Sequence, residues 1–128
     1  GFGWQCSAMG TRCTQYSIRL IQNCSTLMVG MAPMASFKKD GDNYTSCGWY
    51  MSCRYGNLYS QRGAFNKHYV GRTCNTDGTV IGVQLKDGEL SFSVIGVDMG
   101  VAFRALPNAD QMYPAFDMYE HNCEFEFL

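Results

Sequence analysis

Hydrophobic and polar residues alternate most regularly between residues 78 and 96, in two runs that flank Asp87-Gly88. An Asp-Gly dipeptide between alternating runs is the strongest short-range signal for a β-hairpin. With these two residues as the turn, the register places one apolar and one polar face on the hairpin. The facing pairs are Ile81–Val94, Val83–Phe92 and Leu85–Leu90 on the apolar face, and Gly82–Ser93 and Gln84–Ser91 on the polar face. The apolar face is therefore predicted to lie against the core.

Shorter patterned segments predict further strands, and no segment keeps the three-to-four residue spacing of an amphipathic helix for long. The predicted strands cover residues 16–20, 27–32, 49–53, 57–60, 100–103, 112–118 and 123–127. Many short strands separated by turn dipeptides, with little or no helix, predict an all-β fold, an antiparallel β-sandwich. Two segments without a pattern, 33–47 and 61–76, are predicted to be functional or mobile loops.

Length and charge narrow the classes of function. The 128 residues predict one domain, long enough to bury a core without disulfide staples. Only 16% of the residues are charged, and the formal net charge is −1. A protein that binds nucleic acid usually carries a basic surplus, so we expect no nucleic-acid partner. Aromatic residues reach 14%, which suits an aromatic core, a tyrosine-rich recognition surface or both.

The seven cysteines are an odd number, which would leave one unpaired in a secreted protein. In the absence of a hydrophobic leader, they predict mostly reduced, buried thiols in an intracellular, cytoplasmic protein, with disulfides as the open alternative. No apolar run approaches the ~20 residues of a membrane span, so no membrane association is expected. The chain begins at Gly1 without an initiator Met, and we therefore expect a domain of a larger protein.

The hairpin and the segments after it carry several motifs in a fixed order. The motif-bearing segments are GTVIGVQLKDGELSFSVIG at 78–96, VDMGVAFRAL at 97–106 and QMYPAF at 111–116. In residue type, order and spacing they resemble the SPRY (B30.2) domain, whose motifs run Gly-Val-x-Leu, Gly-x-Leu-Ser-Phe, Gly-x-Ala-Phe and Tyr-Pro-Ala. The resemblance implies a single SPRY-like domain over residues 1–128, folded as a bent antiparallel β-sandwich. The SPRY motifs match residues 78–127. Residues 15–77 keep the family's order of strands, but fewer residues match.

Several positions depart from the family pattern. Tyr16 stands where the family has the Trp of a Trp-Glu-Val strand, and residues 28–32 (Met-Val-Gly-Met-Ala) resemble its Val-Gly-Val strand. Lys86 replaces an Asp after the first motif, and Ile95-Gly96 replaces Asn-Gly. The chain thus resembles a divergent member of the SPRY family. The resemblance implies that the framework residues determine the fold and that the loops determine which ligand is bound.

Candidate catalytic and metal sites have simpler explanations. His121 lies beside Cys123 in the sequence, but we interpret it as a loop histidine near a buried cysteine, not as part of a catalytic dyad. No cysteine pair has the C-x2–4-C spacing of a structural zinc site. We therefore predict no catalytic residue, no metal ligand and no cofactor.

Aromatic residues crowd the segment 44–69, beside the two unpatterned loops. Amphipathic aromatics offer a large contact area with little rotamer entropy to lose. Trp49 is expected in the core, and Tyr50, the next residue of the strand, is expected at the surface. The resemblance implies a partner surface built from edge loops, this strand and the segment after Tyr-Pro. The candidate contacts are Met34, Tyr44, Tyr50, Met118 and Tyr119.

The leading hypothesis is a protein-interaction module, an adaptor or scaffold element and not an enzyme, which holds a protein or peptide partner at one edge of the sandwich. Changing Tyr44 and Tyr50 together is expected to weaken partner binding without lowering the melting temperature much. The alternative is a lectin-like carbohydrate-binding domain of the same architecture. A calcium-dependent lectin would need clustered Asp and Asn, and the single such cluster, at 40–43, is explained by a polar turn.

Overall fold

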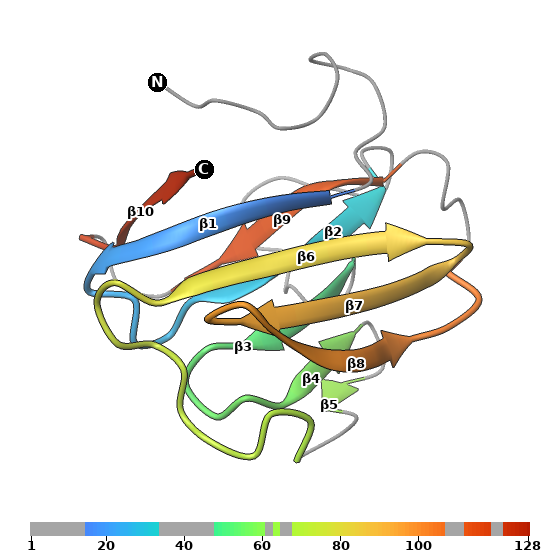
Figure 1. The fold of residues 1–128 in the computed structure, drawn as a ribbon, viewed down its shortest axis with the longest axis horizontal. Helices are drawn as coiled ribbons and strands as arrows, with labels where there is room; N and C mark the ends of the chain where they lie inside the picture. Colours follow the sequence, from blue (N-terminus) through green and yellow to red (C-terminus); the bar gives the residue numbers. More distant parts are fainter. Residues whose placement is uncertain (1–14, 34–47, 61–62, 65–67, 107–111, 119–121) are drawn as a thin grey trace.

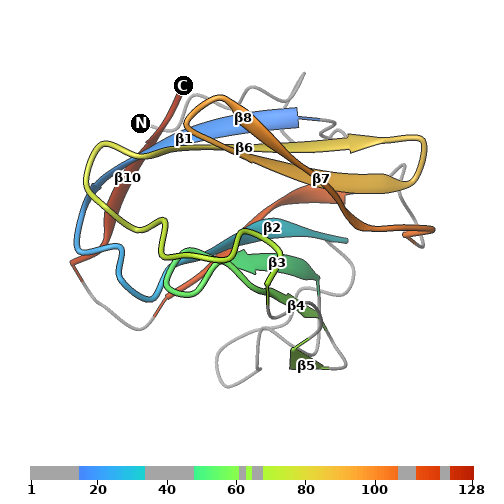
Figure 2. The ribbon, with the colours of Figure 1, turned by 60° about the horizontal axis from the view of Figure 1, so that its bottom comes forward.

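The structure, a computed structural model, describes residues 15–33, 48–60, 63–64, 68–106, 112–118 and 122–128, none of which is helical. These residues form two five-stranded antiparallel sheets (Figure 1). The first sheet runs, in spatial order, β10 (Glu124–Phe127), β1 (Gln15–Gln22), β6 (Val80–Lys86), β7 (Glu89–Val94) and β8 (Val97–Phe103). The second sheet runs β5 (Gly63–Ala64), β4 (Leu58–Ser60), β3 (Trp49–Ser52), β2 (Met28–Pro33) and β9 (Met112–Asp117). Figure 2 shows the sheets as two stacked layers, and the predicted β-sandwich is confirmed.

β6 and β7 form the predicted hairpin in the predicted register, from Ile81 opposite Val94 to Lys86 opposite Glu89. Asp87 and Gly88 have φ angles of 52° and 76°. A type I′ turn requires positive φ at both central residues, which explains the Asp-Gly signal. Because all six side chains of the predicted apolar face are buried, the hairpin is a framework element of the core.

Strand boundaries differ from the prediction where the sequence pattern is short. β8 begins at Val97 and not at Gly100, because Ile95-Gly96 forms a second tight turn with φ angles of 52° and 77°. β5 lies within the predicted loop 61–76, where it pairs with the edge of β4. A two-residue strand is too short to show any period in the sequence.

The core lies between the two sheets and is filled by side chains from both. Tyr16, Ile18 and Leu20 of β1 share the buried face, and Val29 and Met31 of β2 face them from the second sheet. The two layers are therefore held together by alternate residues of each strand, as expected for a sandwich.

An aromatic cluster closes the sandwich near its C-terminal strand. Phe125 and Phe127 project from β10 in the first sheet, and Phe116 projects from β9 in the second. The ring centroid of Phe116 lies 4.6 Å from that of Phe125 and 5.7 Å from that of Phe127. These contacts join two strands that belong to different sheets.

Candidate interaction surface

The outer face of the second sheet carries a group of aromatic and apolar side chains. Because Val29, Met51, Leu58 and Phe116 point into the core, their neighbours along each strand point outward. We call the outward set the tyrosine face; its members are Met28, Tyr50, Tyr59, Tyr113 and Asp117. All of them except Tyr50 are half-buried. The face is built from four strands, of which only β3 and β4 are close together in the sequence.

Strand register explains how these side chains meet. Tyr50 of β3 faces Tyr59 of β4 on one side and Gly30 of β2 on the other. Gly30 in turn faces Ala115 of β9, so the tyrosines lie in one row with two small residues. Small residues beside Tyr50 leave space for its ring to lie against the sheet.

The prediction that Tyr50 lies at the surface is wrong. Alternation placed it correctly on the face opposite Trp49, but only 1% of its side chain is exposed. Tyr50 packs with Ala32, Ala115 and Met28 in a small cluster outside the main core. The ring also reaches over Gly48, where an added Cβ atom would lie 2.8 Å from the Tyr50 hydroxyl. Tyr50 is therefore enclosed by its small neighbours and cannot act as an exposed contact in this conformation.

The end of β9 holds one further candidate contact, Met118. Its side chain is half-buried and packs against the main core, so part of its surface remains accessible. Burial raises the pKa of the neighbouring Asp117 carboxyl, and a hydrogen bond from the Met118 backbone N–H partly offsets that shift. The candidates Met34, Tyr44 and Tyr119 lie outside the described residues.

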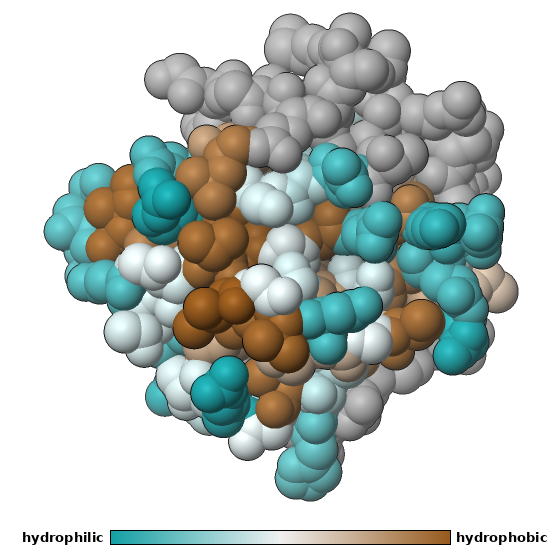
Figure 3. Space-filling model, in the orientation of Figure 1, coloured by the Kyte–Doolittle hydropathy of each residue, from teal (hydrophilic) through white to brown (hydrophobic). Residues whose placement is uncertain are grey.

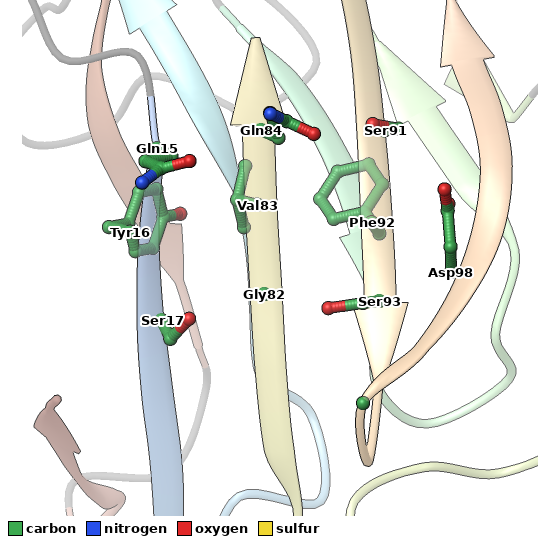
Figure 4. Close-up of a pocket in the computed structure, with 11 residues that line it drawn as sticks. Gln15, Tyr16, Ser17, Gly82, Val83, Gln84, Ser91, Phe92, Ser93 and Asp98 are labelled. Atoms are coloured by element: carbon green, nitrogen blue, oxygen red, sulfur yellow. The ribbon is translucent and has the colours of Figure 1, made fainter.

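A polar hollow of about 290 Å³ lies on the outer face of the first sheet, over β1, β6 and β7. Figure 3 shows a pale band of weakly polar residues over this part of the sheet. In Figure 4, the Ser17 and Ser93 side chains point from either side toward Gly82. A Cβ atom at Gly82 would lie 2.3 Å from the Ser93 Oγ atom, so the glycine keeps the hollow open. The rim carries amide, hydroxyl and carboxylate groups, from Gln15, Gln84, Ser91 and Asp98 among others.

Sequence reasoning predicted two strands of this hollow and missed the hollow itself. The polar pairs Gly82–Ser93 and Gln84–Ser91 were visible in the hairpin pattern. The missing wall is β1, whose Ser17 lies opposite Gly82 across a pairing that joins distant parts of the chain. The signal present in the sequence is a mid-strand glycine, Gly82, that faces a small residue, Ser93, in the predicted hairpin.

No described group of three or more His, Cys, Asp or Glu side chains could hold a metal ion. His68 is exposed, and His121 lies outside the described residues. The described residues contain no helix that is long and apolar enough to cross a membrane.

Comparison with known proteins identifies the architecture. A family model for the SPRY domain matches residues 11–128. The crystal structure of the SPRY domain of human HERC1 has a TM-score of 0.67 at 19% identity, covering 92% of this chain and 75% of that chain. A crystal structure described as a human SPRY domain has a TM-score of 0.69 at 18% identity, covering 89% of this chain and 74% of that chain. No curated protein matches the sequence.

Proposed function

Because the chain belongs to the SPRY domain family, whose members generally act as protein-interaction modules, we propose that it binds a protein or peptide partner at the tyrosine face and its adjoining loops. The observation that carries this proposal is the row of half-buried Tyr59 and buried Tyr50, with half-buried Tyr113 on the neighbouring strand. Tyrosines held by strands have already lost rotamer freedom, so a partner gains contact area at a small entropic cost.

The proposed surface combines side chains with different tasks. Tyr59, Tyr113 and Met118 supply accessible apolar area, and Met34, Tyr44 and Tyr119 are proposed to extend it from the loops. Tyr50 supports the surface from beneath, since it is buried among Ala32 and Ala115.

Asp117 suggests the chemistry that the partner presents. Burial raises the pKa of this carboxyl, which means that the charged form lacks full solvation. A cationic side chain or an N–H donor from a partner would stabilise the carboxylate at the edge of the apolar contact. We therefore propose a partner segment that combines an apolar or aromatic residue with a basic one.

The proposed mechanism is non-enzymatic and needs no cofactor, since binding uses a preformed surface. We further propose that the domain serves as an adaptor or scaffold element of a larger protein in the cytoplasm. The similarity to a structure that is one domain of human HERC1 supports the proposal that this chain is a domain of a larger protein. The buried thiols of Cys24, Cys53 and Cys74, which form no disulfide among the described residues, support a cytoplasmic location, because thiols persist in reducing compartments.

A binding experiment with matched tyrosine variants tests the proposal. Partners captured by the purified protein are identified by mass spectrometry, and the interacting segment is then titrated as a synthetic peptide. Tyr113→Ala and Tyr59→Ala are each expected to weaken the Kd about tenfold or more, the loss typical of a hot-spot residue.

Tyr55 provides the matched control, since it is an exposed tyrosine outside the tyrosine face. Tyr55→Ala should leave the Kd unchanged, and circular dichroism should show that all three variants are folded. Unchanged affinity for both Tyr59→Ala and Tyr113→Ala, or an equal loss for Tyr55→Ala, would contradict the proposed surface.

The polar hollow favours carbohydrate binding as a second candidate function. Hydroxyl, amide and carboxylate groups on the rim match the donors and acceptors of a sugar. The two aromatic rings beneath the hollow, Tyr16 and Phe92, are buried and offer no stacking face, which favours the first candidate. A glycan array with and without calcium tests the alternative, and binding that Ser93→Ala abolishes would favour it over the tyrosine face.

A further inference from the structure

We propose that Cys24 and Cys123 are a redox-modifiable pair, which forms a reversible disulfide when the protein meets a small disulfide oxidant. The Sγ atoms of the two residues lie 3.3 Å apart, although the residues are separated by 99 positions in the sequence. Neither cysteine belongs to the tyrosine face, and the bond needs no partner protein to form.

Strand pairing explains why the two cysteines meet. β1 and β10 are antiparallel neighbours, and their pairing ends where Gln22 faces Glu124. Cys24 follows the end of β1 and Cys123 precedes the start of β10, so the topology brings both to the same end of the first sheet. Figure 1 shows this end at the left, where β10 begins beside the end of β1.

Hydrogen bonds hold the Cys24 thiol between the two strands. Its Sγ atom lies 3.1 Å from the Glu124 carbonyl oxygen and 3.4 Å from that of Gln22. An S–S bond of about 2.0 Å requires the sulfurs to approach by about 1.3 Å. We propose that rotation of the half-buried Cys123 side chain, which lies just before the start of β10, supplies this approach.

Accessibility sets the order of events. Among the four described cysteines, Cys24, Cys53 and Cys74 are buried and Cys123 is half-buried. An oxidant from solvent therefore meets the Cys123 sulfur first. Cys24 lies behind it as the resolving thiol, a common arrangement in redox-sensitive pairs.

The exchange balances with oxidised glutathione as the oxidant. The Cys123 thiolate attacks one glutathione sulfur, which forms a mixed disulfide and releases one glutathione thiolate. The Cys24 thiol then loses its proton to solvent, and its sulfur attacks the Cys123 sulfur. The Cys24–Cys123 bond forms as the bond to the second glutathione breaks. Two protein thiols are oxidised and one glutathione disulfide is reduced to two thiols.

A second cysteine pair provides an internal comparison. The backbone N–H of Cys74 donates to the Cys53 carbonyl oxygen at 2.8 Å, which places the two residues side by side. The hydrogen bond between the two thiols, together with burial, raises the pKa of Cys53, and the same hydrogen bond lowers the pKa of Cys74. Both residues are buried, so an oxidant from solvent reaches neither sulfur as readily as the sulfur of half-buried Cys123. This pair should remain reduced while Cys24 and Cys123 react.

Oxidation of the full chain tests the proposal. The reduced protein is equilibrated with oxidised glutathione, its remaining thiols are alkylated, and its disulfides are mapped by peptide mass spectrometry. We expect the Cys24–Cys123 bond to form before any bond that involves one of the other five cysteines. Closing a long loop should raise the melting temperature by at least about 5 °C, and dithiothreitol should reverse the rise.

Serine variants supply the controls. Cys24→Ser should stop at a glutathione adduct on Cys123, Cys123→Ser should form neither product, and Cys74→Ser should retain the bond. A persistent glutathione adduct on Cys123 in the wild type, or a first bond at Cys53–Cys74, would overturn the proposal. Mapping of the wild-type protein decides between these outcomes even if a serine variant fails to fold.

Discussion

At the residue scale, Ile95 shows a conflict between its side chain and its backbone. Its φ angle is 52°, in the left-handed region that a β-branched residue rarely adopts. The side chain is 66% exposed, so little packing offsets the strain. The family pattern has Asn at this position of the turn, a residue that tolerates the left-handed conformation well. This departure was visible in the sequence, but the sequence alone could not show that it carries strain.

Ile95→Asn is expected to stabilise the protein by about 1 kcal/mol, because it relieves left-handed strain and removes exposed apolar surface. Urea unfolding followed by circular dichroism measures the free energy of unfolding. Val97→Asn is the matched control, since Val97 is 57% exposed and lies in β8 without a positive φ. If both variants gain the same free energy of unfolding, the effect comes from the removal of exposed apolar surface and not from relief of strain in the turn.

At the scale of the element, the two mid-strand glycines Gly30 and Gly82 have different roles. A Cβ atom at Gly30 would lie 1.8 Å from the Trp49 carbonyl oxygen, a backbone atom of the neighbouring strand. At Gly82, the nearest atom would be the side-chain oxygen of Ser93, which can rotate away. Both glycines look alike in the sequence, and only the paired strands distinguish a close backbone approach from an open hollow.

Gly30→Ala is therefore expected to destabilise the protein by at least about 2 kcal/mol, because β2 and β3 must separate to admit the methyl group. Gly82→Ala should cost less than about 1 kcal/mol, since a side chain can yield and a strand glycine is itself unfavourable. The comparison uses the midpoint of urea unfolding at constant slope. If the two variants lose the same free energy of unfolding, the clash between the new methyl group and the Trp49 backbone is not the cause.

Tyr50 illustrates how far strand patterns predict the candidate site. Alternation assigned it to the correct face of β3, opposite Trp49. Exposure depends instead on the neighbouring strands, which place Gly30, Ala32 and Ala115 around the ring. Positions 32 and 115 lie far apart in the chain, so no local pattern could reveal this environment. Because Tyr50 is buried, we now expect its substitution to lower the melting temperature, so the Tyr44 and Tyr50 double variant would not separate partner binding from stability.

At the scale of the whole molecule, a few polar contacts cross between the layers. The Tyr16 hydroxyl in the first sheet donates a hydrogen bond to the Gly30 carbonyl oxygen in the second, at 2.6 Å. Burial raises the pKa of this phenol well above its usual range, and the nearby Tyr50 hydroxyl raises it further. The phenol therefore remains a neutral donor at all ordinary pH values. Tyr16 stands where the family has Trp, so this bond is a feature of a divergent position.

Tyr16→Phe is expected to lower the free energy of unfolding by about 1–2 kcal/mol, since it removes a buried donor while keeping the ring. Tyr55→Phe serves as the control, because that tyrosine is 55% exposed and should tolerate the change. Thermal unfolding monitored by near-ultraviolet circular dichroism measures both. If Tyr16→Phe leaves the free energy of unfolding unchanged, the hydrogen bond between the sheets contributes nothing to stability.

The sequence by itself determined the all-β class, the hairpin register and the family, because alternation and turn residues act between neighbours in the chain. The tertiary structure alone decided which faces are covered, where the polar hollow opens and which cysteines meet. The Cys24–Cys123 contact, the wall that Ser17 adds to the polar hollow and the burial of Tyr50 all arise from pairings between strands that are distant in the sequence. Such pairings depend on the packing of the whole chain, so a local sequence pattern does not predict them.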